Sequence, residues 1–487
     1  MTTSSTQKFN RSAAWIALAC LVVPMFASYF FDDIFSSISY LFENPALTQL
    51  GWDAAGYGLY TSGYSVLCVF GGLVVCGILL DKWGVRITGS IFVGMMAAGA
   101  GLVLWALLSG SSASLTVAYV GCMFFGLGSE IAGTAVTRSI AKWFKGGPMA
   151  LAMGLQLAIA RLGTAFALVL SPKLVQQLSG HVYSLTETAR PAVVGMGLMA
   201  LGLILWAVFV ALDARADRFE RKGVFPSAKK KADATGNTPF PSEQNTANVP
   251  EKAAPSGASA KLSAEEGAPS SASNDEFRMK DVLGVLGNRN FWLLGLLCVL
   301  FYSSIIAFKK FAGAILIPRF DIPAEAAGWM VSMLPFSTVI FAPLFGMLVD
   351  KAGKGTRWMV LGAILALIAH LLLAFAPAGV PFWGYLSMVF LGFGYSLVPA
   401  ALWPSVPKIV PDKVLGTTFA LIYWVQNLGL LSFKWLAGII LGKSADNGPV
   451  SVELMFVGLC VAAVVVALLF RRVSASHPEL QLDKPNR

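Results

Sequence analysis

The chain has 487 residues, of which 56% are hydrophobic and only 13% are charged, and its mean hydropathy is +0.69. This composition excludes an ordinary soluble globular protein. The net charge of +10 needs no nucleic-acid partner, because the basic residues mark one side of a membrane. The sequence shows no nucleotide-binding loop, metal-ligand spacing or nucleophile–base pair, so we expect neither an enzyme nor a bound cofactor or metal.

Twelve apolar stretches, each long enough to cross about 30 Å of hydrocarbon as a helix, follow one another along the chain. They cover residues 13–41, 55–80, 87–109, 114–143, 147–172, 191–213, 289–317, 324–349, 357–376, 381–410, 413–441 and 450–470. Lys and Arg cluster in alternate loops, which predicts that both termini are cytoplasmic. We therefore predict an all-α membrane protein with twelve transmembrane helices.

A polar stretch rich in Pro, Ala, Ser and Lys separates six of these helices from the other six. Such a composition cannot bury enough apolar surface to offset its ordering entropy. It predicts a disordered cytoplasmic linker, residues 214–287, between an N-terminal bundle (1–213) and a C-terminal bundle (288–487). The halves also repeat: Asp350 follows Asp81 by 350 − 81 = 269 residues, and Asn427 follows Arg161 by 427 − 161 = 266. This spacing indicates a parallel duplication of a six-helix unit.

Charged residues lie late in the first and seventh stretches, at comparable heights. Asp32 and Asp33 belong to the first stretch, and Lys309 and Lys310 belong to the seventh. We interpret them as a salt bridge that closes the outer side of the protein. Two alternatives remain: the side chains reach to the outer interface, or the lysines contact an acidic group of the substrate.

Glu130 and Arg161 are the deepest charges on adjacent stretches of the first half, both about 21–23 Å along their helices at about 1.5 Å per residue. A charge at the bilayer centre costs roughly 2.5–3.5 kcal/mol on insertion scales, so such residues usually face the bundle interior and take part in function. We interpret Arg161 as binding a carboxylate and Glu130 as binding an ammonium. Two alternatives remain. Glu130 and Arg161 form a structural ion pair, or Glu130 titrates and couples transport to protons.

Other polar and aromatic side chains inside the apolar stretches are candidates for the same site. Pro399 and Pro404 predict a broken hydrogen-bond ladder in the tenth stretch, with carbonyls free near a cavity. His370 is a weaker candidate, because a lone polar residue on an apolar helix is usually satisfied structurally. The candidates are Tyr395, Trp403, Gln426 and Asn427 in the second half, joined more weakly by Tyr64 and Gln156 in the first.

The stretch from Gly77 to Arg86, Gly-Ile-Leu-Leu-Asp-Lys-Trp-Gly-Val-Arg, returns in shorter form from Gly346 to Gly353. It resembles the signature loop of the major facilitator superfamily. The resemblance implies two pseudo-symmetric six-helix bundles. It also implies that Asp81, Arg86 and Asp350 are gate and packing residues and not ligands of the substrate.

Several motifs are similar to those of a narrower branch, the lysosomal dipeptide uniporters: Trp-Phe-Lys-Gly at 143–146, Ala-Arg-Leu-Gly at 160–163, Ala-Leu-Trp-Pro at 401–404 and Gln-Asn-Leu-Gly at 426–429. This resemblance implies that Glu130 and Arg161 hold the two ends of a zwitterionic dipeptide. Lys309, Lys310 and Arg138 depart from the branch, and they leave room for acidic side chains or other carboxylates. We count Arg138 among the gate residues.

These observations predict a secondary transporter that moves dipeptides or similar small zwitterions by alternating access, as a uniporter. The alternative is a proton-coupled transporter of organic anions, amino acids or sugars. We expect a monomer in the lipid bilayer with a small-molecule substrate, and leave an accessory subunit open. The bacterial inner membrane is the expected location, because the sequence lacks an acidic dileucine signal and glycosylation acceptors in its outer loops; a lysosomal-type membrane is the alternative.

Overall fold

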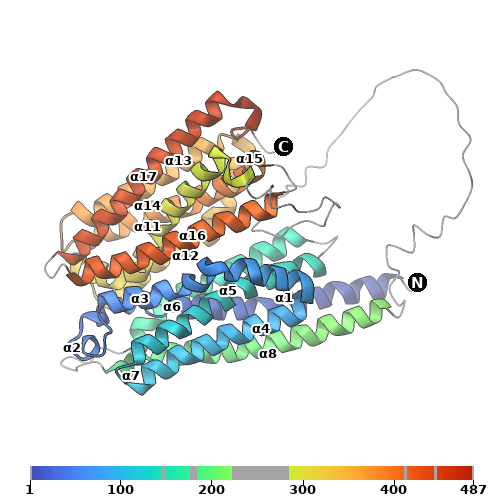
Figure 1. Cartoon of the computed structure of the whole chain (residues 1–487), viewed down its shortest axis with the longest axis horizontal. Helices are drawn as coiled ribbons and strands as arrows, with labels where there is room; N and C mark the ends of the chain where they lie inside the picture. The colour runs from blue at the N-terminus through green and yellow to red at the C-terminus, as the bar shows by residue number, and fades with distance from the viewer. Residues whose placement is uncertain are drawn as a thin grey trace, which may run out of the picture.

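The computed structural model describes residues 3–144, 148–175, 184–221, 284–410, 414–443 and 447–484. These residues are almost entirely helical (Figure 1). The elements of the first half are α1 (Thr3–Asp32), η1 (Ser36–Glu43), α2 (Pro45–Thr48), α3 (Ala54–Leu67), η2 (Cys68–Gly72), α4 (Leu73–Ser109), α5 (Ser114–Trp143), α6 (Met149–Leu174), α7 (Leu185–Thr188) and α8 (Arg190–Arg221).

The second half repeats this series of long helices. Its elements are α11 (Arg289–Phe320), α12 (Ala324–Ala352), α13 (Gly355–Phe375), α14 (Pro381–Leu402), η3 (Trp403–Ser405), α15 (Val406–Ile409), α16 (Leu415–Lys443), α17 (Gly448–Ser476) and η5 (Pro478–Leu480). Within the described residues, α8 continues to Arg221, past the predicted boundary at 213. Most of the predicted linker, residues 222–283, lies outside the described residues.

The described residues contain eleven helices that are long and apolar enough to cross a membrane. The predicted second stretch is not among them, because it is divided into α3, the π-turn η2 and the start of α4. Gly71, with φ of 91°, interrupts the regular helix inside η2. Gly84, with φ of 76°, lets the chain leave this stretch and enter the third, since a left-handed backbone carries no Cβ penalty at glycine. The second and third predicted stretches therefore both exist as helical segments.

The first predicted stretch is confirmed as one span from Ser12 to Glu43, in which α1 ends at Asp32 and the 3-10 helix η1 follows. One expectation about a helix break was wrong. The tenth stretch does not break at Pro399, since α14 continues to Leu402 and the Trp403 N–H donates to the Pro399 carbonyl. The change to 3-10 geometry comes three residues later, at the Trp403–Ser405 turn that contains Pro404.

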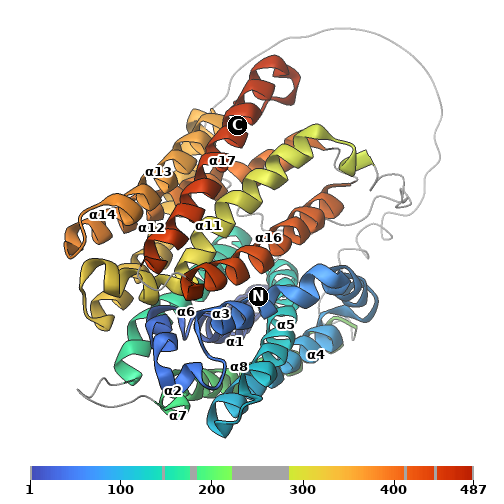
Figure 2. The same cartoon turned by 60° about the vertical axis from the view of Figure 1, so that its left-hand side comes forward.

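The long helices form two bundles, α1–α8 and α11–α17, that lie side by side (Figures 1 and 2). In the first bundle α1 packs on α6 and α8, and α4 on α5; in the second, α13 packs on α14 and α17, and α11 on α17. The start of α1 and the end of α17 lie at one end of the molecule, which we call the inner end after the predicted topology. The end that carries α2 and α7 is the outer end.

Among the described residues, three of the most extensive contacts between the bundles involve the outer halves of their helices. α3 packs against α16, α6 against α12, and η1 against α11. Aromatic side chains seal this contact: Phe42 stacks on Tyr57 at 4.5 Å between ring centroids, and Tyr57 meets Phe311 of the other bundle edge-on at 5.2 Å. The Tyr57 hydroxyl donates to the Lys310 carbonyl at 3.0 Å. In this structure the outer end is closed.

The residues that follow α17 fold back onto the inner end of the second bundle. Asp483 accepts hydrogen bonds from the Thr356 backbone N–H and the Thr356 hydroxyl, both at 2.9 Å. Ser474 of α17 donates to the same carboxylate at 3.1 Å, and the Lys354 N–H donates to the Asp483 carbonyl at 2.8 Å. Asp483 therefore joins the end of α17 to the start of α13, where helix N–H groups need acceptors.

Candidate substrate-binding site

Arg161 is a charged side chain that connects the two bundles near the middle of the molecule. It lies in α6, is half-buried, and donates from Nη1 to the hydroxyl of Tyr395 in α14 at 3.1 Å. Its guanidinium carbon also lies 5.6 Å from the ring centroid of Tyr29 and 5.5 Å from that of Tyr395. The aromatic faces stabilise the cation by its interaction with their quadrupoles. Arg161 is thus held between one aromatic ring from each bundle.

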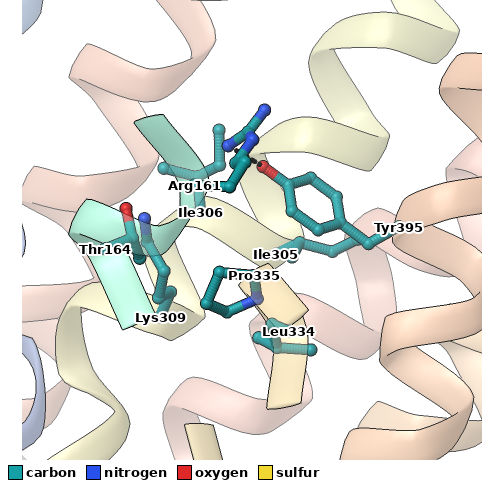
Figure 3. Close-up of a pocket in the computed structure, with 8 residues that line it drawn as sticks. All are labelled: Arg161, Thr164, Ile305, Ile306, Lys309, Leu334, Pro335 and Tyr395. Atoms are coloured by element: carbon teal, nitrogen blue, oxygen red, sulfur yellow. Dashed lines mark hydrogen bonds between the residues drawn. The ribbon is translucent and has the colours of Figure 1, made fainter. Parts of the chain in front are cut away.

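A small pocket opens beside this guanidinium. It is lined by Arg161, Thr164, Ile305, Ile306, Lys309, Leu334, Pro335 and Tyr395 (Figure 3). The lining comes from α6 of the first bundle and from α11, α12 and α14 of the second. Among the described residues, Arg161 and Tyr395 are the predicted binding residues that line it, and Glu130 is not one of the eight. The pocket has the position expected of a binding site between two bundles.

Glu130 is held by a tyrosine of its own bundle. It lies half-buried in α5, and its Oε1 accepts a hydrogen bond from the Tyr64 hydroxyl at 3.1 Å. The same hydroxyl lies 3.3 Å from the hydroxyl of Ser129, which is 2.6 Å from that of Ser28 in α1. Tyr64, a weaker candidate from the sequence, therefore orients the carboxylate that was predicted to attract an ammonium.

Trp403 belongs to an aromatic cluster that extends inward from Tyr395. Its ring stacks on Tyr423 at 5.1 Å, and its Nε1 donates to the Tyr302 hydroxyl at 3.2 Å. Tyr302 meets Tyr395 edge-on at 6.2 Å. Trp403 is only 8% exposed and does not line the pocket in this structure; it contacts Tyr302, which packs against the lining residue Tyr395.

The three predicted binding residues with amide side chains lie apart from the pocket. Gln426 is buried and accepts from the Cys298 thiol at 3.7 Å, while Asn427 is buried and donates to the Tyr423 carbonyl one turn earlier in α16 at 3.1 Å. The Asn427 Oδ1 atom has no partner among the described residues. Gln156 is half-buried in α6. The structure brings none of these three residues to the lining of the Arg161 pocket.

The acidic and basic residues of the first and seventh stretches meet as ion pairs. Asp33 lies 2.6 Å from Lys309 and 3.0 Å from Lys310, and Asp32 lies 2.8 Å from Lys310. Asp33 and Lys310 are almost completely buried, with 1% and 2% of their surfaces exposed. Thr164 of α6 donates to Asp33 at 2.8 Å and Ser36 donates at 3.1 Å. These ion pairs join the two bundles directly above the pocket, on its outer side.

Most of the remaining predicted gate residues lie nearer the inner end. Arg86 contacts Asp213 at 3.0 Å and also Asp217, which ties α4 to α8. Lys142 of α5 lies 2.8 Å and 2.9 Å from the same two carboxylates. Arg138 in α5 and Asp350 in α12 are half-buried. The side chain of Asp81 lies outside the described residues.

Sequence reasoning missed several residues that surround the site. Lys434 in α16 is 2% exposed, donates to the Thr61 carbonyl at 2.7 Å, and lies 5.4 Å from the Tyr64 ring centroid. Tyr29, Thr164 and Tyr302 were also not singled out. In the sequence, a lysine near the end of an apolar stretch cannot be distinguished from one that reaches to the membrane interface. A single aromatic or hydroxyl residue forms no sequence pattern that indicates a site. The signal that was available for Lys434 was its distance of nine residues from the end of α16.

The match of the sequence to a family model identifies the fold. The model of the Major Facilitator Superfamily matches residues 25–429 and, in a second match, 311–486. The chain belongs to the major facilitator superfamily. As expected for that superfamily, it is a multi-pass membrane protein with the fold of a transporter, and not an enzyme.

Relatives of this superfamily member agree with the narrower resemblance. It is 28% identical over 451 residues to the lysosomal dipeptide transporter MFSD1 of Danio rerio, and the match covers 88% of this chain and 83% of the relative. It is 27% identical over 431 residues to the human protein of the same name, covering 86% and 78%.

Solved structures of other transporters share the fold. The xylose transporter XylE from E. coli superposes with a TM-score of 0.66 at 13% identity, covering 95% of this chain and 96% of that one. The nucleoside transporter NupG superposes with a TM-score of 0.62 at 12% identity, covering 94% and 98%. At these identities the comparison extends to the arrangement of helices and not to the substrate.

Proposed function

We propose that this chain moves dipeptides or similar small zwitterions across a membrane by alternating access, as a uniporter. Arg161 binds the substrate carboxylate and Glu130 binds its ammonium. The observation that carries the proposal is the position of Arg161, which lines a pocket between the bundles and reaches Tyr395 of the opposite bundle. The curated relatives named as dipeptide transporters support this class of substrate.

Arg161 suits a carboxylate because its planar guanidinium can form two parallel hydrogen bonds to the two oxygens. Its hydrogen bond to Tyr395 and the two aromatic rings fix its orientation, so less side-chain entropy is lost when a substrate binds. Glu130 is oriented by Tyr64 in the same way. Arg161 and Glu130 both belong to the first bundle, and Arg161 is bonded to Tyr395 of the second. A zwitterion bound at Arg161 therefore also lies beside Tyr395, and this links occupancy to the movement of the bundles.

The test is uptake of Ala-Ala into proteoliposomes that contain the purified full chain. Each hydrogen bond to a charged group contributes about 1.5–3 kcal/mol, so we expect Arg161→Gln and Glu130→Gln to reduce the apparent affinity about 10- to 150-fold. Arg190→Gln, at an exposed arginine that starts α8, is the matched control and should transport normally. Undiminished uptake by both site variants would remove the proposed site.

Blocked substrates assign the two ends. Ala-Ala amide lacks the carboxylate, so it should bind the wild type more weakly than Ala-Ala does. Replacing Arg161 should then weaken the binding of the amide little further. N-acetyl-Ala-Ala lacks the ammonium and should show the same relation with Glu130→Gln. The assigned orientation is reversed if the amide is instead insensitive to Glu130→Gln and the N-acetyl peptide is insensitive to Arg161→Gln.

The alternative is proton-coupled transport of organic anions, amino acids or sugars, and the cations Arg161 and Lys309 in the pocket lining favour an anionic group in the substrate. A pH-sensitive dye inside the proteoliposomes distinguishes the two mechanisms. A uniporter carries Ala-Ala without a stoichiometric proton flux, whereas a coupled transporter acidifies or alkalinises the lumen. The bacterial inner membrane stays our predicted location, while the curated relatives are named as lysosomal.

A further inference from the structure

The pocket beside Arg161 contains a second cation. Lys309 lines it from α11, while Arg161 lines it from α6 (Figure 3). Among the described residues, no carboxylate belongs to the lining, whose other polar side chains are those of Thr164 and Tyr395. A neutral zwitterion needs one cation and one anion from the protein. This lining therefore offers one more positive group than the carboxylate of a neutral dipeptide can use.

Asp33 has hydrogen-bond donors other than Lys309. One oxygen of Asp33 accepts from Lys309 and Thr164, and the other accepts from Lys310 and Ser36. Lys310 contacts both Asp32 and Asp33. Asp33 thus keeps three donors when Lys309 turns toward the pocket. The Lys309 ammonium has three N–H groups, and among the described residues its ion pair is the single one with Asp33.

The position of Lys309 separates it from Lys310. Lys310 is 2% exposed and is not part of the pocket lining, whereas Lys309 is 9% exposed and reaches the pocket wall. A buried ammonium attracts a carboxylate strongly, because little solvent screens the interaction. It interacts less favourably with an uncharged group of the same shape.

We propose that Lys309 forms a subsite for a second negatively charged group of the substrate, so that the chain prefers dipeptides that carry an Asp or Glu side chain. In this arrangement Arg161 holds the main-chain carboxylate and Lys309 holds the side-chain carboxylate. The inference rests on the proposed function, since it assigns a further part of the same site.

Binding measurements on the purified full chain in detergent test the subsite. The ligands are two pairs that differ only in charge, Ala-Glu with Ala-Gln and Glu-Ala with Gln-Ala, and the readout is the ratio of the two Kd values within each pair. We expect the wild type to bind the better glutamyl peptide at least about 10-fold more tightly than its glutaminyl partner, as for one added hydrogen bond between charged groups.

The variants assign the preference to Lys309. Lys309→Gln should bring the ratio to about 1, and Lys309→Arg should retain most of it, because the positive charge remains. Lys443→Gln, at the exposed end of α16, is the control and should keep the ratio. A melting curve on each variant shows that it is folded before binding is measured.

Three outcomes would overturn the subsite. They are a wild-type ratio near 1, a ratio that Lys309→Gln leaves unchanged, and an equal loss of the ratio in Lys309→Gln and Lys443→Gln. In each case binding of the neutral peptides leaves the proposed function intact. If neither acidic nor neutral peptides bind the wild type, both the proposed function and the subsite fail.

Discussion

The backbones of Gly58 in α3 and Gly438 in α16 touch across the interface between the two bundles. A Cβ atom on Gly438 would lie 2.5 Å from the Ala54 carbonyl oxygen and 2.8 Å from the Gly58 Cα, and a Cβ atom on Gly58 would lie 2.9 Å from the Gly438 Cα. Such distances are too short for real side chains, so the outer closure requires glycine at both positions. Small residues commonly allow helices to approach this closely in membranes.

We expect Gly58→Val to prevent the outer end from closing, because neither backbone can give way to a branched side chain. Transport should then fall severely, and the outer surface of α16 should become accessible to maleimide at an introduced cysteine. Gly197→Ala in α8 is the control, since a Cβ atom there meets nothing within 4 Å. Normal transport by Gly58→Val would show that this contact does not form during the cycle.

The Asp33 ion pairs should contribute strongly to the closed state. Replacing Asp33 with Asn leaves Lys309 and Lys310 buried without their main counter-charge, and breaking one partner of a buried pair typically costs about 3–5 kcal/mol. We expect a lower melting temperature in detergent and faster labelling of a cysteine placed at Ser37. The double variant Asp33→Asn, Lys309→Met should recover part of the melting temperature. An additive effect of the two replacements would indicate that the pair is not energetically coupled.

Variants of Lys434 test whether this buried charge serves transport and not stability. Its ammonium is buried against the Thr61 carbonyl and the Tyr64 ring, and among the described residues it has no carboxylate partner. We expect Lys434→Met to be at least as stable as the wild type, because methionine fills similar space without a buried charge, but to transport more slowly. Lys434→Ala should lose about 2–5 kcal/mol through the cavity it leaves. Equal destabilisation by both replacements would contradict this.

The tail contact through Asp483 should stabilise the start of α13. Asp483→Ala removes the acceptor of the Thr356 N–H and hydroxyl, and the loss of such a capping acceptor costs about 1 kcal/mol. We expect faster hydrogen exchange in the first turn of α13 and a slightly lower melting temperature. Lys484→Ala is the control, because Lys484 contributes its backbone carbonyl to Lys408. Unchanged exchange at Thr356 in Asp483→Ala would exclude the cap.

The internal repeat was the most productive sequence signal, because duplicated bundles place equivalent residues at equivalent contacts. A similar spacing relates Gly58 to Gly328, at 328 − 58 = 270. A Cβ atom on Gly328 would lie 2.4 Å from the Leu168 carbonyl oxygen, in the matching contact between α12 and α6. The contact of α3 with α16 and that of α6 with α12 thus exchange under the repeat.

The residues that escaped prediction lack such a pattern. Lys434 has no equivalent charge in the first half, because the repeat spacing of 266 maps it onto Leu168. Glu453 lies near the start of its stretch and was not considered, yet it is fully buried and 2.8 Å from His370. Depth along a helix predicted Arg161 and Glu130, but it cannot predict which tyrosine from another helix will orient each of them. Those contacts depend on side-chain directions that only packing decides.

Asp33 receives hydrogen bonds from three different segments, through Ser36 of η1, Thr164 of α6, and the two lysines of α11. Since one oxygen atom is shared by donors from both bundles, the bundles cannot separate by releasing these contacts one after another at little cost. Each partial release would leave buried charges unpaired. We therefore expect the outer end to open and close in an all-or-none manner, with partly open molecules too rare to accumulate during transport.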